Sequence, residues 1–358
     1  MGKRNYGIDL LRLVSMFLVI VLHVLGQGGV LKSAAEGSGT YAAAWFLEVL
    51  AYGAVDIFAV ISGYVGYRDP VRKTRLSSYI LLWLQVASVG LAAALFFRLL
   101  RPDLVPRSEL VLMLRPVSKK LYWYFTAYTG LFFIKPLLDR AVAACSETTA
   151  RKVFLAIFLV FSCFNTLLCF DEKSLSFNLN GGYSFAWISL LYLLGAIMKK
   201  CGLARRLSIP GGLLATLAVT ALTWLSRLYW TEKLVAYTSP TVLCAAILAV
   251  AVFSRIRVGR GMEKLIAFAA PGAFSVYILN CQREVWNLVM HDRFAFLAEK
   301  PAAVMLLGTL LFAFLFVAGA VLCDWVRQQL FRLLRLKELA EAAEKRVEAG
   351  LRLIAEKL

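Results

Sequence analysis

Ten apolar runs dominate this chain, and most are close to the roughly 20 residues that a membrane-crossing helix needs. Because 60% of the 358 residues are hydrophobic, the chain could not cover a water-soluble surface with polar groups. The pattern therefore predicts an all-α integral membrane protein, a bundle of about ten transmembrane helices. The runs are 8–27, 45–66, 76–97, 121–138, 153–170, 183–198, 211–230, 238–254, 265–287 and 302–323.

The basic residues between these runs predict how the helices are oriented. The N-terminal segment and every second loop are richer in Lys and Arg, as the cytoplasmic loops of membrane proteins are. Because ten spans are an even number, both termini lie on one side of the membrane, and this charge pattern predicts that side to be the cytoplasm. The pattern is typical of a multi-pass protein of a bacterial cytoplasmic membrane.

One loop, residues 98–120, does not follow this rule. Either a span nearby is miscounted, or the loop uses its positive charge to attract an anionic acceptor molecule or anionic lipid headgroups. Six basic side chains lie on this predicted external segment: Arg98, Arg101, Arg107, Arg115, Lys119 and Lys120.

Composition argues against several other classes of function. The formal net charge is +18, but the basic residues stand in short clusters between apolar runs, so no nucleic-acid partner is expected. The seven cysteines are an odd number without CxxC spacing, and the chain has only two histidines, His23 and His291. We therefore expect neither a disulfide scaffold nor a metal site built by the protein.

The C-terminal segment, about 327–358, differs from the rest of the chain. Apolar residues recur every three or four positions among charges of both signs, which predicts an amphipathic helix. We expect a membrane domain over residues 1–326 and a cytoplasmic helix over 327–358. This helix could lie on membrane lipid or against the bundle, or it could form a short coiled coil in a homodimer.

Three ionisable residues interrupt the first apolar run, where such groups are costly and usually functional or paired. Asp9 and Arg12 are close enough in sequence to pair on a helix surface. His23 follows Arg12 by eleven residues, which places both side chains on one helix face, about 16 Å apart along the axis. A neutral imidazole in a cavity is the most usual general base near neutral pH, so His23 is a candidate base.

The second run carries Asp56 at a depth between those of Arg12 and His23. Asp56 could pair with Arg12 or His23, or it could be catalytic, as a carboxylate that orients a histidine is. Farther along the same run, Ser62 and Gly63 suit a close crossing of two helices.

These residues resemble motifs of the membrane acyltransferase 3 family over about residues 6–323. The motif of that family's first helix, an Arg and a His separated by ten residues, is similar to Tyr6-Gly7-Ile8-Asp9-Leu10-Leu11-Arg12 with His23. The motif of its second helix is similar to residues 54–64, which contain Asp56 and end in Ser62-Gly63-Tyr64. Two weaker similarities are Tyr122-Trp123-Tyr124-Phe125 with Pro136, and Phe274-Ser275-Val276-Tyr277-Ile278-Leu279-Asn280, in which Asn280 stands where many members have histidine.

The resemblance implies transfer of an acyl group, commonly acetyl, from cytoplasmic acyl-CoA to a hydroxyl of an extracytoplasmic glycan or lipid-linked sugar. It implies no permanently bound cofactor, with His23 as the catalytic base and Arg12 positioning the donor. The planar guanidinium of Arg offers a fork of N–H donors that suits the phosphates of CoA. A basic cluster at this place could also serve only to keep the loop on the cytoplasmic side of the membrane. The cluster at the cytoplasmic end of the second run comprises Arg68, Arg72, Lys73 and Arg75.

The acceptor is expected near the outer ends of the later spans. Trp123, Tyr124 and Tyr128 form an aromatic face there, which is either an interfacial belt or a surface for stacking a sugar. Arg283 and Glu284 lie near the outer end of the ninth run, at about the level of His23. They could pair at the interface, or Glu284 could line the acceptor mouth together with Asn280.

A function of another class also fits these polar residues. A transporter or flippase for a small polar or lipid-linked solute could use Asp9, Arg12, His23 and Asp56 as a relay. The lack of an internal repeat argues against such a transporter.

Overall fold

The computed structural model describes residues 4–168 and 177–355, and these residues form helices and no strands. The predicted all-α class is therefore confirmed. The helices are α1 (Tyr6–Leu25), α2 (Val30–Ser33), α3 (Gly39–Tyr52), α4 (Ala54–Gly66), α5 (Leu76–Leu100), α6 (Arg107–Met113), α7 (Trp123–Ala144), α8 (Glu147–Ala156), α9 (Asn165–Leu167), α10 (Phe185–Lys200), α11 (Ile209–Tyr229), α12 (Pro240–Phe253), α13 (Arg260–Ala269), α14 (Ala273–Asn280), α15 (Ala302–Leu333) and α16 (Leu336–Ala355), with π-helical segments at Ile157–Phe164 and Val285–Met290.

Seven helical segments of the described chain are long and apolar enough to cross a membrane, fewer than the ten we predicted. The three other predicted spans form α7, which contains three charged residues, and α10 and α12, which have only 16 and 14 residues. Residues 169–170 of the fifth predicted run lie outside the described residues. The seven segments are Tyr6–Ser33, Gly39–Gly66, Leu76–Leu100, Glu147–Leu167, Ile209–Tyr229, Arg260–Asn280 and Ala302–Leu333.

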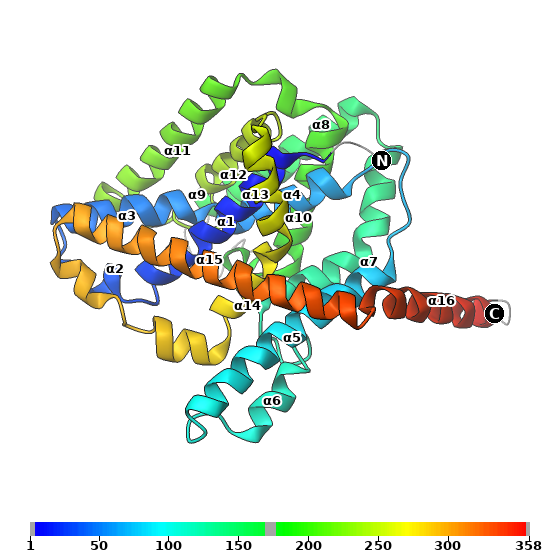
Figure 1. The fold of residues 1–358 in the computed structure, drawn as a ribbon. Helices are drawn as coiled ribbons and strands as arrows, with labels where there is room; N and C mark the ends of the chain where they lie inside the picture. The colour runs from blue at the N-terminus through cyan, green and yellow to red at the C-terminus, as the bar shows by residue number, and fades with distance from the viewer. Residues whose placement is uncertain (1–3, 169–176, 356–358) are drawn as a thin grey trace.

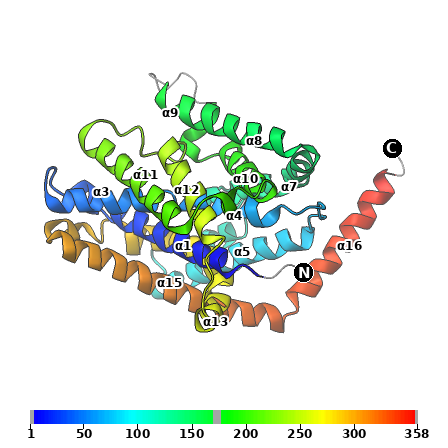
Figure 2. The same ribbon diagram turned by 90° about the horizontal axis from the view of Figure 1, so that it is seen from above.

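Helix α1 is the central element of the bundle. It packs against α3, α4, α12, α13, α14 and α15, and it runs lengthwise between α4 and α15 in Figures 1 and 2. The side chain of Asn5 caps its first turn by accepting a hydrogen bond from the backbone N–H of Ile8 at 3.1 Å. Asp9 is buried within these contacts, and Arg12 and His23 are half-buried.

The second predicted run is two helices. Gly53 ends α3 and precedes α4, so the apolar segment Gly39–Gly66 is interrupted near its middle. Asp56 stands in the first turn of α4, and its side chain is buried.

Helices α4 and α10 cross in direct backbone contact. A Cβ on Gly63 would overlap the carbonyl oxygen of Tyr192, and a Cβ on Gly195 would overlap the carbonyl oxygen of Val60. The predicted close crossing at Gly63 is confirmed, with a second glycine on the partner helix that permits the same approach.

The C-terminal helix begins later than we predicted. α15 continues to Leu333, the chain turns at Arg335 with a φ of 50°, and α16 begins at Leu336 rather than at 327. α16 points away from the bundle in Figure 2.

Acidic residues on α16 contact the start of α5 and the loop before it. Glu341, Glu344 and Glu348 recur at helical spacing and so share one face of α16. The contacts are Lys73 Nζ to Glu348 Oε1 at 2.5 Å, Arg75 Nη2 to Glu341 Oε1 at 2.9 Å, and the Leu76 backbone N–H to Glu344 Oε1 at 2.7 Å.

The two described ends of the chain lie toward the same end of the bundle. Figure 1 shows both ends and the α4–α5 loop on the right, whereas α2 and the segment before α15 lie on the left. We name the end at which α1 begins the Arg12 end, and the opposite end the His23 end. Which end faces the cytoplasm stays a prediction.

Candidate active site

The imidazole of His23 lies between α14 and the π-helical segment that follows it. Its Nδ1 contacts Oδ1 of Asn280, and the Trp286 ring meets it edge-on with centroids 4.8 Å apart. With the amide oxygen of Asn280 as acceptor, Nδ1 is the donor of this hydrogen bond, and a neutral imidazole then has its lone pair on Nε2. Asn280 thus has the place that a carboxylate has beside the histidine of many active sites.

A cavity of about 60 Å³ adjoins His23, and we call it the His23 cavity. Its lining is otherwise aromatic and aliphatic, and it includes the predicted acceptor-side residues Trp123 and Tyr124. The other lining residues are Met16, Val19, Leu22, Val55, Phe58, Tyr183, Tyr237, Phe274 and Tyr277.

Two aromatic residues of this lining, Tyr183 and Tyr237, were missed by the sequence analysis. The ring of Tyr183 lies 4.7 Å from that of Trp123 and 5.0 Å from that of Tyr237, measured between centroids. Tyr183 precedes α10 and Tyr237 precedes α12, so neither has a helical period or a motif that could mark it.

Arg12 lies on the same helix as His23, toward the opposite end. Its Nη1 donates to Oδ1 of Asp9 at 2.7 Å, and Arg4 binds the other oxygen of Asp9 at 2.5 Å. The predicted pairing of Asp9 with Arg12 is therefore confirmed.

A large cavity of about 820 Å³ opens at the Arg12 end, and we call it the basic cavity. It brings together three of the four Arg residues that we predicted to bind the donor: Arg12, Arg68 and Arg72. Six basic and two acidic side chains line it, together with uncharged residues. These charged residues are Arg4, Arg12, Arg68, Arg72, Lys199 and Lys200, with Asp9 and Asp69.

Arg75, the fourth predicted donor residue, lies outside this cavity because it pairs with Glu341 and Glu344 of α16. The motif residue Tyr64 instead lines the basic cavity, and Lys199 Nζ lies 5.0 Å above its ring centroid. Lys200 bonds three backbone carbonyls at the end of α7 and beyond, which occupies its ammonium group.

A third cavity of about 190 Å³, the middle pocket, also contacts Arg12. Ser62, Tyr128 and Lys135 are among its lining residues, so the predicted aromatic face divides: Tyr128 faces this pocket, and Tyr124, one turn earlier, faces the His23 cavity. Lys135 pairs with Asp139 at 2.5 Å. The middle pocket therefore shares Arg12 with the basic cavity, and Tyr128 on its wall stands one turn of α7 from Tyr124 of the His23 cavity.

A family model described as an acyltransferase domain, that of acyltransferase 3, matches residues 5–328. The chain belongs to this family. The match covers nearly the whole chain, so the resemblance read from the motifs is confirmed, and the protein is a multi-pass membrane acyltransferase. No curated protein and no solved structure matches it.

In this acyltransferase, Asp56 does not contact Arg12 or His23, contrary to one of our expectations. Its Oδ1 accepts a hydrogen bond from the indole N–H of Trp187 at 3.1 Å, and its Oδ2 has no hydrogen-bond partner within the described chain. Asp56 therefore joins α4 to α10, and Asn280 rather than Asp56 orients the imidazole of His23.

Glu284 of the acyltransferase is buried against Gln282 and does not line the His23 cavity. Its neighbour Arg283 pairs instead with Glu109 of α6 at 2.9 Å. This pair places α6, within the basic loop 98–120, at the His23 end of the bundle.

Proposed function

We propose that this protein transfers an acyl group, in particular acetyl, from cytoplasmic acyl-CoA to a hydroxyl of an extracytoplasmic glycan or lipid-linked sugar. One observation carries the proposal: a single face of α1 presents Arg12 to a basic cavity and, about 16 Å along the axis, His23 to an aromatic cavity. A polyanionic donor and a sugar acceptor need two such different surroundings.

The basic cavity suits the phosphates of the donor. Arg12, Arg68 and Arg72 offer forked N–H donors that match phosphate oxygens, and the surrounding lysines add positive charge. With the phosphates there, the pantetheine arm follows α1 past Ser62 and Tyr128 in the middle pocket, and the thioester reaches His23.

His23 supplies the base for the reaction. Nε2 takes the proton of the acceptor hydroxyl while that oxygen attacks the thioester carbonyl carbon. The resulting tetrahedral intermediate expels the CoA thiolate, the new ester remains on the acceptor, and the proton passes from Nε2 to the thiolate sulfur. The bond from Nδ1 to Asn280 holds the imidazole in the required tautomer throughout.

The lining of the His23 cavity supports both a short acyl group and a sugar acceptor. At about 60 Å³ the cavity has room for a group of acetyl size but not for a long chain. A sugar ring does not fit inside it as well, so we place the pyranose at the rim of the cavity, against Trp123 and the exposed ring of Tyr183. The basic residues of loop 98–120 lie at the same end and would attract an acceptor that carries phosphate.

The wider setting is part of the same proposal. We place the protein in a bacterial cytoplasmic membrane, crossing it about ten times with both termini in the cytoplasm. Acyl-CoA is then a substrate rather than a resident cofactor, and the exposed apolar residues of α16 are free to contact membrane lipid or a second copy.

Thioester cleavage distinguishes this activity from solute transport. The detergent-purified protein, given acetyl-CoA and a glycan preparation from the cell surface, should release free CoA thiol, and mass spectrometry should detect the acetylated glycan. A transporter or flippase would move its solute in proteoliposomes without releasing any thiol. Thiol release without an acetylated product would contradict the proposed acceptor class.

Removing the Arg12 side chain should weaken the binding of the acyl-CoA donor more than the binding of the acceptor. Arg12→Ala removes charge-assisted hydrogen bonds and should raise the KM for acyl-CoA by about 10- to 100-fold. Arg12→Lys should restore only part of this loss, since a point charge replaces a fork. The KM for the acceptor should change little.

The matched control is Arg75→Ala, because Arg75 stands near the same loop but points to α16. Its KM for acyl-CoA should stay close to that of the wild type. Equal effects of Arg12→Ala and Arg75→Ala would show that the cavity does not bind the donor.

A further inference from the structure

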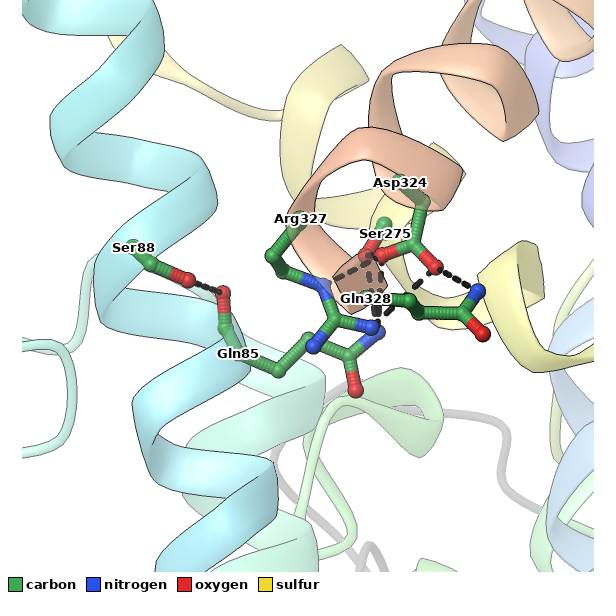
Figure 3. Close-up of polar contacts among 6 residues, drawn as sticks. All are labelled: Gln85, Ser88, Ser275, Asp324, Arg327 and Gln328. Carbon is green, nitrogen blue, oxygen red and sulfur yellow. Dashed lines mark hydrogen bonds and ion pairs between the residues drawn. The ribbon is translucent and has the colours of Figure 1, made fainter. Parts of the chain in front are cut away.

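A buried carboxylate on α15 joins three helices, and one of them is α14, which ends at Asn280. The side chain of Asp324 on α15 is fully buried, and Figure 3 shows side chains from α5, α14 and α15 converging on it. Its donors are Arg327 Nε at 2.6 Å and Nη2 at 3.1 Å, Gln328 Nε2 at 2.7 Å and Ser275 Oγ at 2.5 Å, and Gln85 Nε2 donates to Ser275 at 2.7 Å.

A groove of about 360 Å³ lies beside this cluster, between α5 and α15. Each side carries both apolar and polar side chains, and both arginines come from α15, so the groove offers apolar surface next to positive charge. The lining residues are Ser78, Leu81, Leu82 and Gln85 of α5, and Arg327, Gln328, Phe331 and Arg332 of α15.

The two arginines of the groove are available in different ways. Arg327 gives Nε and Nη2 to Asp324 and stacks on Phe331 at 4.6 Å, so its guanidinium is fixed while Nη1 does not contact Asp324. Arg332 contacts Gln329 at 3.3 Å and forms no ion pair within the described chain. The groove therefore presents a positive charge that no protein carboxylate neutralises.

The surroundings of the groove are those of a lipid-facing surface. Leu330, Leu333 and Leu334 next to Arg332 are 52%, 77% and 60% exposed, as expected where acyl chains replace water. Arg332 stands in the last turn of α15 and lines the groove near the start of α5. The ends of membrane-spanning helices lie at the depth of the lipid headgroups, so we expect Arg332 at that depth. Basic pockets between membrane helices on the cytoplasmic side commonly hold anionic headgroups.

We propose that this groove binds one anionic phospholipid of the leaflet at the Arg12 end. The phosphate accepts hydrogen bonds from Arg332 and from Nη1 of Arg327, and an acyl chain lies along Leu81 and Leu82. The bound lipid bridges α5 and α15, and through Ser275 it supports α14, the helix that ends at Asn280. This site does not depend on the proposed transfer reaction.

A lipid titration of the detergent-purified full chain tests the site. Dioleoylphosphatidylglycerol should raise the thermal midpoint of the wild type more than dioleoylphosphatidylcholine does. Arg332→Gln should weaken the apparent affinity for phosphatidylglycerol about fivefold, because one basic residue near a membrane surface contributes that factor to the binding of anionic lipid. Ser78→Phe should fill the groove and reduce the response without touching the Asp324 cluster.

The matched control is Arg346→Gln, which removes an exposed basic residue of α16 outside the groove and should respond like the wild type. Equal responses of Arg332→Gln and Arg346→Gln would overturn the proposal, because general charge attraction would then explain the binding. A shift of the same size with soluble glycerol 3-phosphate would also overturn it in favour of a site for free phosphate.

Discussion

Replacing His23 with alanine should reduce acyl transfer by about 10²–10⁴-fold, the usual contribution of a general base. The variant should still insert and fold, because the Nδ1–Asn280 bond is one contact among the many that hold α1 in the bundle. The measurement is acceptor-dependent release of CoA by equal amounts of purified wild-type and variant protein.

Variants of Asn280 test the residue that positions the imidazole separately from the imidazole itself. Asn280→Leu leaves Nδ1 without its acceptor and should lower kcat while leaving the KM for acyl-CoA unchanged. Asn280→Asp keeps an acceptor at the same place and should retain more activity than Asn280→Leu. Transfer at near wild-type rate by well-folded His23→Ala would overturn the assignment of the base.

Replacing Gly63 with alanine should produce the largest loss of stability among single methyl additions in the helices described. The new Cβ would overlap a backbone carbonyl oxygen of α10, which cannot turn aside as a flexible side chain could. Overpacking of this kind costs about 1–3 kcal/mol, and the two helices must separate to relieve it. The thermal midpoint in detergent should fall accordingly.

Gly319→Ala is the matched control for this substitution. Gly319 lies within α15, and a Cβ there would meet no atom within 4 Å. Alanine is a better helix former than glycine by about 0.5–1 kcal/mol, so the midpoint should hold or rise slightly. A Gly63→Ala variant as stable as Gly319→Ala would mean that α4 and α10 are not in backbone contact.

Helical geometry alone predicted the placement of Arg12 relative to His23. Eleven residues return a side chain to nearly the same face of a helix, and the structure gives each residue a cavity on that face. The close crossing at Gly63 was predicted in the same way, because small residues mark the places where helices approach.

The contacts that a side chain makes with neighbouring helices could not be predicted, because they involve residues distant in sequence. The depth of Asp56 was calculable, but its partner Trp187 comes from α10, which follows 131 positions later. Arg75 looks identical in the sequence to Arg68 and Arg72, and only the return of α16 removes it from the basic cavity. The interruption at Gly53 was also hidden, since one glycine in an apolar run permits either a continuous or a broken helix.

The cations along the proposed donor path have a consequence for the membrane itself. A protein that joins a cytoplasmic donor to an external acceptor must not let ions leak through the same route. Arg12 and Lys135 both face the middle pocket, each held beside a single aspartate. On the proposed path a cation that leaves the basic cavity would pass these two ion pairs in turn, and a positive group fixed on the wall of a pore is one of the barriers that exclude cations. If Arg12 binds the polyanionic donor as we propose, the same guanidinium would also oppose the leak of cations across the bilayer.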